Sequence, residues 1–67
     1  MSAFSGKLKA LRQANDIAQY IMADYLGVQL RTYQRYESGS NMPNYEKLLK
    51  LARFFNVTTD YLLGNEE

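Results

Sequence analysis

Arg31 and Arg35 are the side chains whose type and spacing offer the clearest chemistry in this sequence. They stand four residues apart in the segment 30–37, where Tyr33 and Tyr36 mark the apolar face of an expected helix. Residues four apart share a helix face, so both guanidinium groups are expected to point away from the core. There they could bind O6 and N7 of guanine, clamp a phosphate, or simply be solvated. The spacing makes this face a candidate for contact with nucleic acid.

The preceding segment, 19–26, is expected to form a helix that packs closely against 30–37. Ala23 is small at the point where a second helix must cross, and Gly27 can take the left-handed conformation that ends a helix. We expect this helix to begin near Ala18, which has no side-chain oxygen to cap it. Together these features predict a helix-turn-helix.

Apolar residues at helical spacing predict three further helices. The first lies near the N-terminus, where Phe4, Leu8 and Leu11 share one face. A second follows the loop 38–43, and a short last helix covers 59–63. Their expected N-caps are Ser2 or Ser5, Asn44 and Thr58. Because no strand pattern is present, the sequence predicts an all-α fold, a compact five-helix bundle.

Length and composition limit the class of protein. The chain has 67 residues, of which 46% are hydrophobic, enough for a single domain over 1–67 with a packed core. It has neither cysteine nor histidine, so we expect no disulfide, no metal, no cofactor and no enzyme activity. No apolar run approaches the ~20 residues that span a bilayer, so a cytoplasmic protein with no membrane partner is expected. The formal net charge of +1 is low for a protein that binds nucleic acid.

The order of motifs resembles the phage repressor and Cro type of helix-turn-helix domain, also called the xenobiotic-response-element family. The resemblance covers about Lys7 to Gly64 and includes the segments YIMADYLGVQLRTYQRYESG and MPNYEKLLKLARFFNVTTDYLLG. Its features in fixed order are Leu11-Arg12, Gln19, Ala23, Leu26-Gly27-Val28, Thr32, Tyr36-Glu37, Gly39, Pro43, LLKLA and DYLLG. The resemblance implies a lambda-repressor-like fold. It also implies a transcriptional regulator, a repressor, that binds double-stranded DNA sequence-specifically with helix 30–37 in the major groove.

The resemblance also implies roles for the exposed polar residues. Contacts to base edges fall to Gln29, Leu30, Arg31 and Arg35. Leu30 departs from the polar residue often found there, so it would pack on a thymine methyl group or against Ile21, or stay idle. Gln19 resembles the family glutamine that binds a phosphate oxygen and supports a side chain of helix 30–37. Further expected phosphate contacts are Thr32, Gln34, Ser40, Asn41 and Asn44.

Two positions are expected to be structural. Arg12 and Glu37 resemble the partly buried ion pair that, in many relatives, ties the first helix to the end of the third. Tyr33 stands where most relatives have Val or Ile, so its hydroxyl needs a partner in the core, or its tip emerges near the DNA backbone. The other aromatic side chains expected to pack are Tyr20, Tyr25, Tyr36, Tyr45, Phe54 and Tyr61.

Assembly and the rival interpretation follow from the same resemblance. Small domains of this kind usually bind palindromic operators as symmetric dimers, with half-sites about 34 Å apart. A homodimer, at least on DNA, is therefore implied, and its candidate contacts are Val57, Thr59, Tyr61 and Leu62. The alternative is a protein-interaction module or antitoxin-like partner that uses the same bundle. The near-neutral charge favours this alternative slightly, whereas the polar outer face of 30–37 favours DNA.

Overall fold

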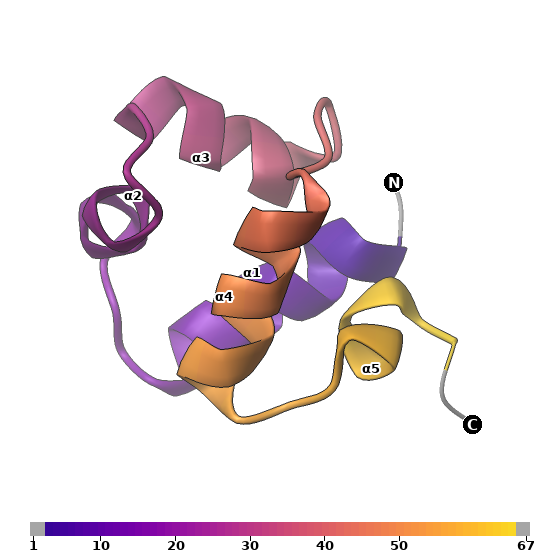
Figure 1. Cartoon of the computed structure of the whole chain (residues 1–67). Helices are drawn as coiled ribbons and strands as arrows, with labels where there is room; N and C mark the ends of the chain where they lie inside the picture. Colours follow the sequence, from indigo (N-terminus) through magenta and orange to yellow (C-terminus); the bar gives the residue numbers. More distant parts are fainter. Residues whose placement is uncertain (1–2, 66–67) are drawn as a thin grey trace.

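A computed structural model describes residues 3–65 of the chain. These residues form five α-helices and contain no strand (Figure 1). The helices are α1 (Ala3–Ala14), α2 (Gln19–Leu26), α3 (Leu30–Ser38), α4 (Tyr45–Phe55) and α5 (Thr59–Leu63). Within this part of the chain no helix is both long enough and apolar enough to cross a bilayer. The predicted all-α, five-helix fold is confirmed, and α3 extends one residue further than expected.

Side chains cap the starts of α4 and α5 as predicted. Oδ1 of Asn44 accepts a hydrogen bond from the backbone N–H of Lys47 at 2.9 Å. Oγ1 of Thr58 accepts one from the backbone N–H of Tyr61, also at 2.9 Å. Such bonds satisfy donors that have no partner within the helix, so they fix where each helix begins.

The starts of α1 and α2 are different. Ala18 precedes α2 in an extended conformation and provides no side-chain cap, as its methyl group requires. The prediction that Ser5 caps α1 is wrong, because Ser5 lies inside this helix and is fully buried. The other candidate, Ser2, lies outside the described residues.

The turn between α2 and α3 forms at Gly27 as predicted. Gly27 has φ 71° and ψ 33°, in the left-handed region. Its N–H donates to the carbonyl of Asp24 at 3.1 Å, and the N–H of Val28 donates to the carbonyl of Ala23 at 3.0 Å. A residue with a Cβ would lose about 1–2 kcal/mol in this conformation. Glycine therefore permits the short turn that returns the chain across α2.

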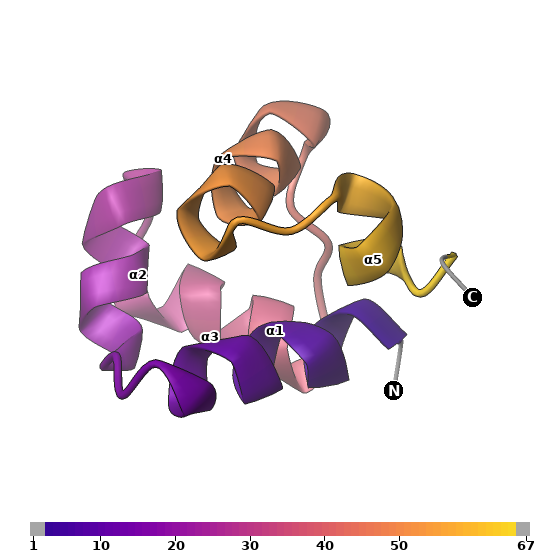
Figure 2. The same cartoon turned by 90° about the horizontal axis from the view of Figure 1, so that it is seen from below.

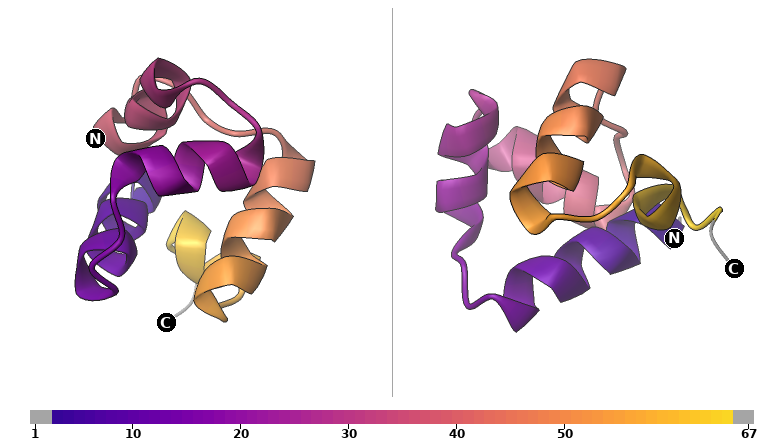
Figure 3. Two further views of the ribbon diagram at one scale, coloured as in Figure 1. Left: turned by 90° about the vertical axis from the view of Figure 1, so that its left-hand side faces the viewer. Right: turned by 60° about the horizontal axis from the view of Figure 1, so that its bottom comes forward.

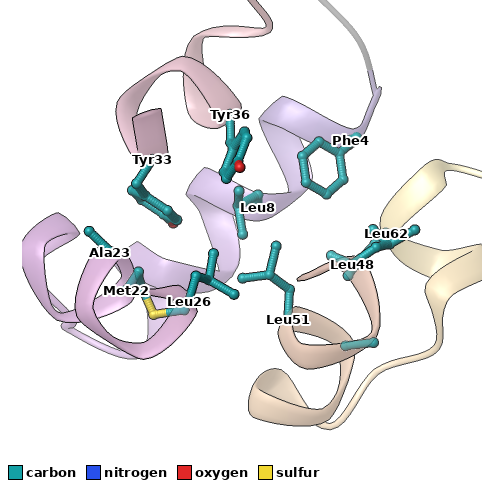
Figure 4. Close-up of a cluster of buried hydrophobic side chains, with 11 residues drawn as sticks. Phe4, Leu8, Met22, Ala23, Leu26, Tyr33, Tyr36, Leu48, Leu51 and Leu62 are labelled. Atoms are coloured by element: carbon teal, nitrogen blue, oxygen red, sulfur yellow. The ribbon is translucent and has the colours of Figure 1, made fainter. Parts of the chain in front are cut away.

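One core joins all five helices (Figure 4). Its fully buried members include Leu8 of α1, Met22 of α2, Tyr33 of α3, Leu51 of α4 and Leu62 of α5. The remaining members are Phe4, Ala23, Leu26, Tyr36, Leu48 and Ala52. Since every helix contributes apolar side chains to the same cluster, the position of α3 is set by packing against its neighbours rather than by the turn alone.

The helices enclose this core from several sides. In Figure 2, α1 and α3 lie on one side, α4 and α5 lie on the opposite side, and α2 closes one end. The left view of Figure 3 shows α2 lengthwise, with α3 lying across its N-terminal part. Helix α3 packs mainly on α2 and α1. Its remaining face is left at the surface of the molecule.

Candidate nucleic-acid interface

The outer face of α3 carries the two arginines. Arg31 and Arg35 are both exposed, whereas Tyr33 and Tyr36 on the opposite face are 0% and 5% exposed. Among residues 3–65, neither guanidinium group forms a salt bridge or a side-chain hydrogen bond. Gln29, Leu30 and Gln34 are exposed beside them, as the sequence predicts, and Thr32 is half-buried. The face is thus polar, cationic and free to bind a ligand.

A salt bridge beneath this face joins α1 to α3. Nε of Arg12 lies 2.5 Å from Oε2 of Glu37, and Nη2 donates to Oε1 at 3.0 Å. Nη1 of Arg12 also donates to the backbone carbonyl of Ile17 at 2.8 Å, which holds the loop before α2. The predicted ion pair is therefore present, and it is two-pronged, the strongest arrangement for a guanidinium and a carboxylate.

Glu37 receives two further hydrogen bonds. The hydroxyl of Tyr33 donates to Oε2 at 2.5 Å, and Nε2 of Gln19 donates to Oε1 at 3.1 Å. With the two bonds from Arg12, each carboxylate oxygen accepts from two donors. Tyr33 is thus a core residue whose hydroxyl has a buried partner. Of the two environments expected for the Tyr33 hydroxyl, a partner in the core or a position near the DNA backbone, the structure shows the first.

The protonation states follow from these contacts. Burial acts to raise the pKa of Glu37, but hydrogen bonds from Arg12, Tyr33 and Gln19 outweigh it and hold the pKa below its ordinary value. Burial, followed by the hydrogen bond to Glu37, raises the pKa of the Tyr33 phenol. At neutral pH the carboxylate is therefore ionised and the phenol keeps the proton that it donates.

Gln19 connects the buried carboxylate to the surface. While its Nε2 donates to Glu37, its Oε1 accepts a hydrogen bond from Nε2 of Gln34 at 3.2 Å. Gln34 lies on the exposed face of α3, so Gln19 supports a side chain of that helix, as its place in the sequence suggests.

The polar residues of the loop between α3 and α4 are exposed. Ser40, Asn41 and Asn44 all lie in this loop, which leads away from the C-terminal end of α3 (Figure 1). The N–H of Asn41 donates to the carbonyl of Arg35 at 3.2 Å, which ties the loop to α3. Because Oδ1 of Asn44 caps α4, only its amide N–H groups remain for another partner.

Two tyrosines expected to pack are instead among the most exposed large side chains. Tyr20 is 60% exposed and Tyr45 is 71% exposed. Tyr20 is the second residue of α2 and falls outside the buried set of Met22, Ala23 and Leu26. The spacing of these three apolar residues could have identified Tyr20 as a surface residue.

The predicted dimer contacts divide into two groups. Tyr61 is exposed and lies under the ammonium group of Lys7, 4.5 Å from the ring centroid, while Val57 and Thr59 are half-buried. Leu62 is 0% exposed and belongs to the core. Its assignment to a dimer surface is wrong, because its side chain has no surface to offer a partner.

Comparison with known proteins identifies the class. Residues 8–62 match the model of the helix-turn-helix family, and the chain belongs to that family, in its phage repressor and Cro type. Its helix-turn-helix consists of α2, the turn at Gly27 and α3.

Particular relatives come from bacteria and a phage. The chain is 40% identical over 63 residues to an uncharacterized HTH-type transcriptional regulator, YqaE of Bacillus subtilis, covering 94% of this chain and 54% of that protein. It is 38% identical over 64 residues to the cryptic phage CTXphi transcriptional repressor RstR of Vibrio cholerae, covering 96% of this chain and 58% of that protein. The chain thus spans about half the length of the curated relatives it matches.

Two solved structures share the fold closely. A transcriptional regulator from Listeria innocua has a TM-score of 0.91 and 34% identity, covering 96% of this chain and 60% of that one. The P22 c2 repressor, solved in complex with a synthetic operator, has a TM-score of 0.85 and 27% identity, covering 94% of this chain and 96% of that one.

Proposed function

We propose that this protein binds double-stranded DNA sequence-specifically and regulates transcription, acting as a repressor, with α3 in the major groove. The observation that carries the proposal is the exposed face of α3. Its two guanidinium groups have no partner within residues 3–65. Helix α3, which carries them, is anchored by the hydrogen bonds that Glu37 accepts from Arg12, Gln19 and Tyr33. The likeness to the P22 c2 repressor, which was solved in complex with a synthetic operator, supports binding to DNA.

We assign the base contacts to residues at the N-terminus of α3 and on its outer face. Arg31 and Arg35 present their guanidinium groups to guanine, and Leu30, 43% exposed, presents an apolar surface to a thymine methyl group. Gln29 stands at the N-cap of α3, where its side chain makes no capping bond and is available to a base.

We assign the phosphate contacts to residues on either side of the outer face of α3. Gln19 has one amide N–H left after it binds Glu37, and this group donates to a phosphate oxygen at the start of α2. The other donors are Thr32, Ser40, Asn41 and Asn44.

The low net charge does not oppose this function, because the charge is unevenly distributed. The one acidic side chain of α3, Glu37, is 6% exposed and neutralised by Arg12. The exposed charges of α3 are therefore only the two arginines. Helix α3 thus presents only positive charge to the proposed interface, although the formal net charge of the chain is only +1.

A homodimer on a palindromic operator completes the proposal. A single domain offers few base contacts, and two domains on half-sites about 34 Å apart double them. We place the dimer contacts at Val57, Thr59 and Tyr61, which retain exposed surface near α5.

The test begins with selection of duplexes from a random pool and titration of the selected sequence. Arg31→Ala should lose about 1–3 kcal/mol of binding free energy at particular base pairs and relax the preference there. Arg53→Ala, which removes an exposed arginine from α4, is the matched control and should leave the sequence preference unchanged. Equal loss on every duplex for Arg31→Ala would contradict base recognition by this residue. Absence of any bound duplex would favour the protein-interaction module.

A further inference from the structure

The buried carboxylate of Glu37 fixes the direction of a chain of hydrogen bonds that ends at the surface. An ionised carboxylate can only accept hydrogen bonds. Oε1 of Glu37 lies 3.1 Å from the side-chain amide of Gln19, so Gln19 must turn its nitrogen toward Glu37. Its carbonyl oxygen is then left to face away from the core.

The same constraint passes to Gln34. Since Gln19 presents Oε1, the amide of Gln34 must present Nε2, and these two atoms are 3.2 Å apart. Gln34 therefore has its carbonyl oxygen and one amide N–H unpaired on the exposed face of α3. It lies four residues after Leu30, in the row beside Arg31 and Arg35.

We propose that Gln34 recognises adenine, with Gln19 and Glu37 as positioning residues; this inference rests on the proposed function. Oε1 accepts a hydrogen bond from the N6 amino group, and the unpaired N–H donates to N7. Cytosine offers the amino group without the adjacent acceptor. A phosphate oxygen could accept from the unpaired N–H but would leave Oε1 without a donor, whereas adenine uses both unpaired groups. We therefore assign Gln34 to a base edge in place of the phosphate contact expected from the family resemblance.

The experiment uses the duplex selected by the wild-type protein. Each adenine is replaced in turn by 7-deazaadenine, which lacks N7, or by purine, which lacks the amino group. At one adenine in each half-site either replacement should weaken wild-type binding about 10-fold. Gln34→Ala should lose the same factor on the unmodified duplex and nothing more on the modified ones.

The positioning role is tested at Gln19, because variants of Glu37 risk unfolding the protein. Gln19→Met keeps the side-chain length and removes both hydrogen bonds. Its loss of phosphate contact weakens all duplexes equally, so the readout is the preference for adenine over 7-deazaadenine at the Gln34 position. That preference should fall several-fold, while the preferences at the Arg31 and Arg35 positions should not change.

A measurement without DNA separates this inference from the proposed function. In NMR spectra, Gln19→Met should shift the side-chain amide signals of Gln34 and leave those of the exposed Gln13 unchanged. The adenine assignment alone is overturned if the protein binds duplexes but Gln34→Ala loses the same factor whether or not any adenine is replaced. It is also overturned if the effect of Gln34→Ala disappears instead on a duplex in which a methylphosphonate replaces one phosphate. Unmoved Gln34 signals overturn the positioning role. Binding to no duplex overturns the proposed function together with this inference.

Discussion

Replacing Tyr33 by phenylalanine removes one hydroxyl from the buried network without changing the shape of the core. The ring of Tyr33 is 0% exposed, and its hydroxyl donates to Oε2 of Glu37 at 2.5 Å. A hydrogen bond to a charged group contributes about 1.5–3 kcal/mol to stability. Tyr33→Phe should therefore lower the free energy of unfolding by about that amount at pH 7. For a domain of this size the midpoint of thermal unfolding falls by roughly 6–24 °C.

Tyr36→Phe is the matched control. Tyr36 packs edge-on against Tyr33, with ring centroids 6.2 Å apart, and is 5% exposed. Within residues 3–65 no buried side-chain oxygen or nitrogen lacks a partner, so the Tyr36 hydroxyl, which bonds no described residue, reaches solvent. Its removal should change stability by less than about 0.5 kcal/mol.

The pH dependence makes the Tyr33 prediction sharper. The pKa of Glu37 is lowered in the folded protein, so its contribution to stability is complete above the ordinary value of 4.5 and is lost as the pH falls through the folded value. Below that pH the acceptor is a neutral carboxylic acid, and the bond from Tyr33 weakens. Urea denaturation at a series of pH values from 7 downward should show that the difference between wild type and Tyr33→Phe is largest at pH 7 and shrinks as the pH falls through the folded pKa of Glu37. A difference that stays constant down to the pH of acid unfolding, or a loss at pH 7 no larger than that of Tyr36→Phe, would refute the reasoning.

Two glycine substitutions should act in opposite directions. Gly6→Ala should stabilise the protein by about 0.5–1 kcal/mol, because a Cβ there meets no atom within 4 Å and alanine favours the helix; a lower midpoint of thermal unfolding would contradict this. Gly64→Ala should destabilise it by more than about 1 kcal/mol in urea titration, because φ is +79° and the added Cβ would lie 2.7 Å from Cβ of Ala3. An unchanged urea midpoint would show that this end of α5 is not held against α1.

Local features of the sequence were sufficient to predict where most helices begin and end. Asn44 and Thr58 cap α4 and α5 through bonds that span three residues, and Gly27 ends α2 by its own conformation. These interactions depend on neighbours in the chain, so they are visible before the tertiary structure is known. The exposure of Arg31 and Arg35 followed in the same way from the helical period of α3.

Residues that depend on packing between helices were harder to assign. Helix α5 has only five residues, so its period could not decide whether Tyr61 or Leu62 faces the core. The bond between Gln19 and Gln34 joins residues 15 apart and depends on the angle at which α3 crosses α2. Tyr33 lies between these cases, because its partner Glu37 is four residues later on the same helix and could have been proposed from the sequence.

The attachment of three helices to one carboxylate affects how genetic screens of this protein should be interpreted. Arg12, Gln19 and Tyr33 all donate hydrogen bonds to Glu37. Removing the charge of Arg12 or the buried hydroxyl of Tyr33 loosens the scaffold that carries α3. Under the proposed repressor function, a screen for derepressed colonies would therefore recover alleles of Arg12 beside alleles of Arg31, although the first group acts through reduced abundance of folded protein. Immunoblots of the mutant strains would separate unstable alleles from those that have lost only the proposed DNA recognition.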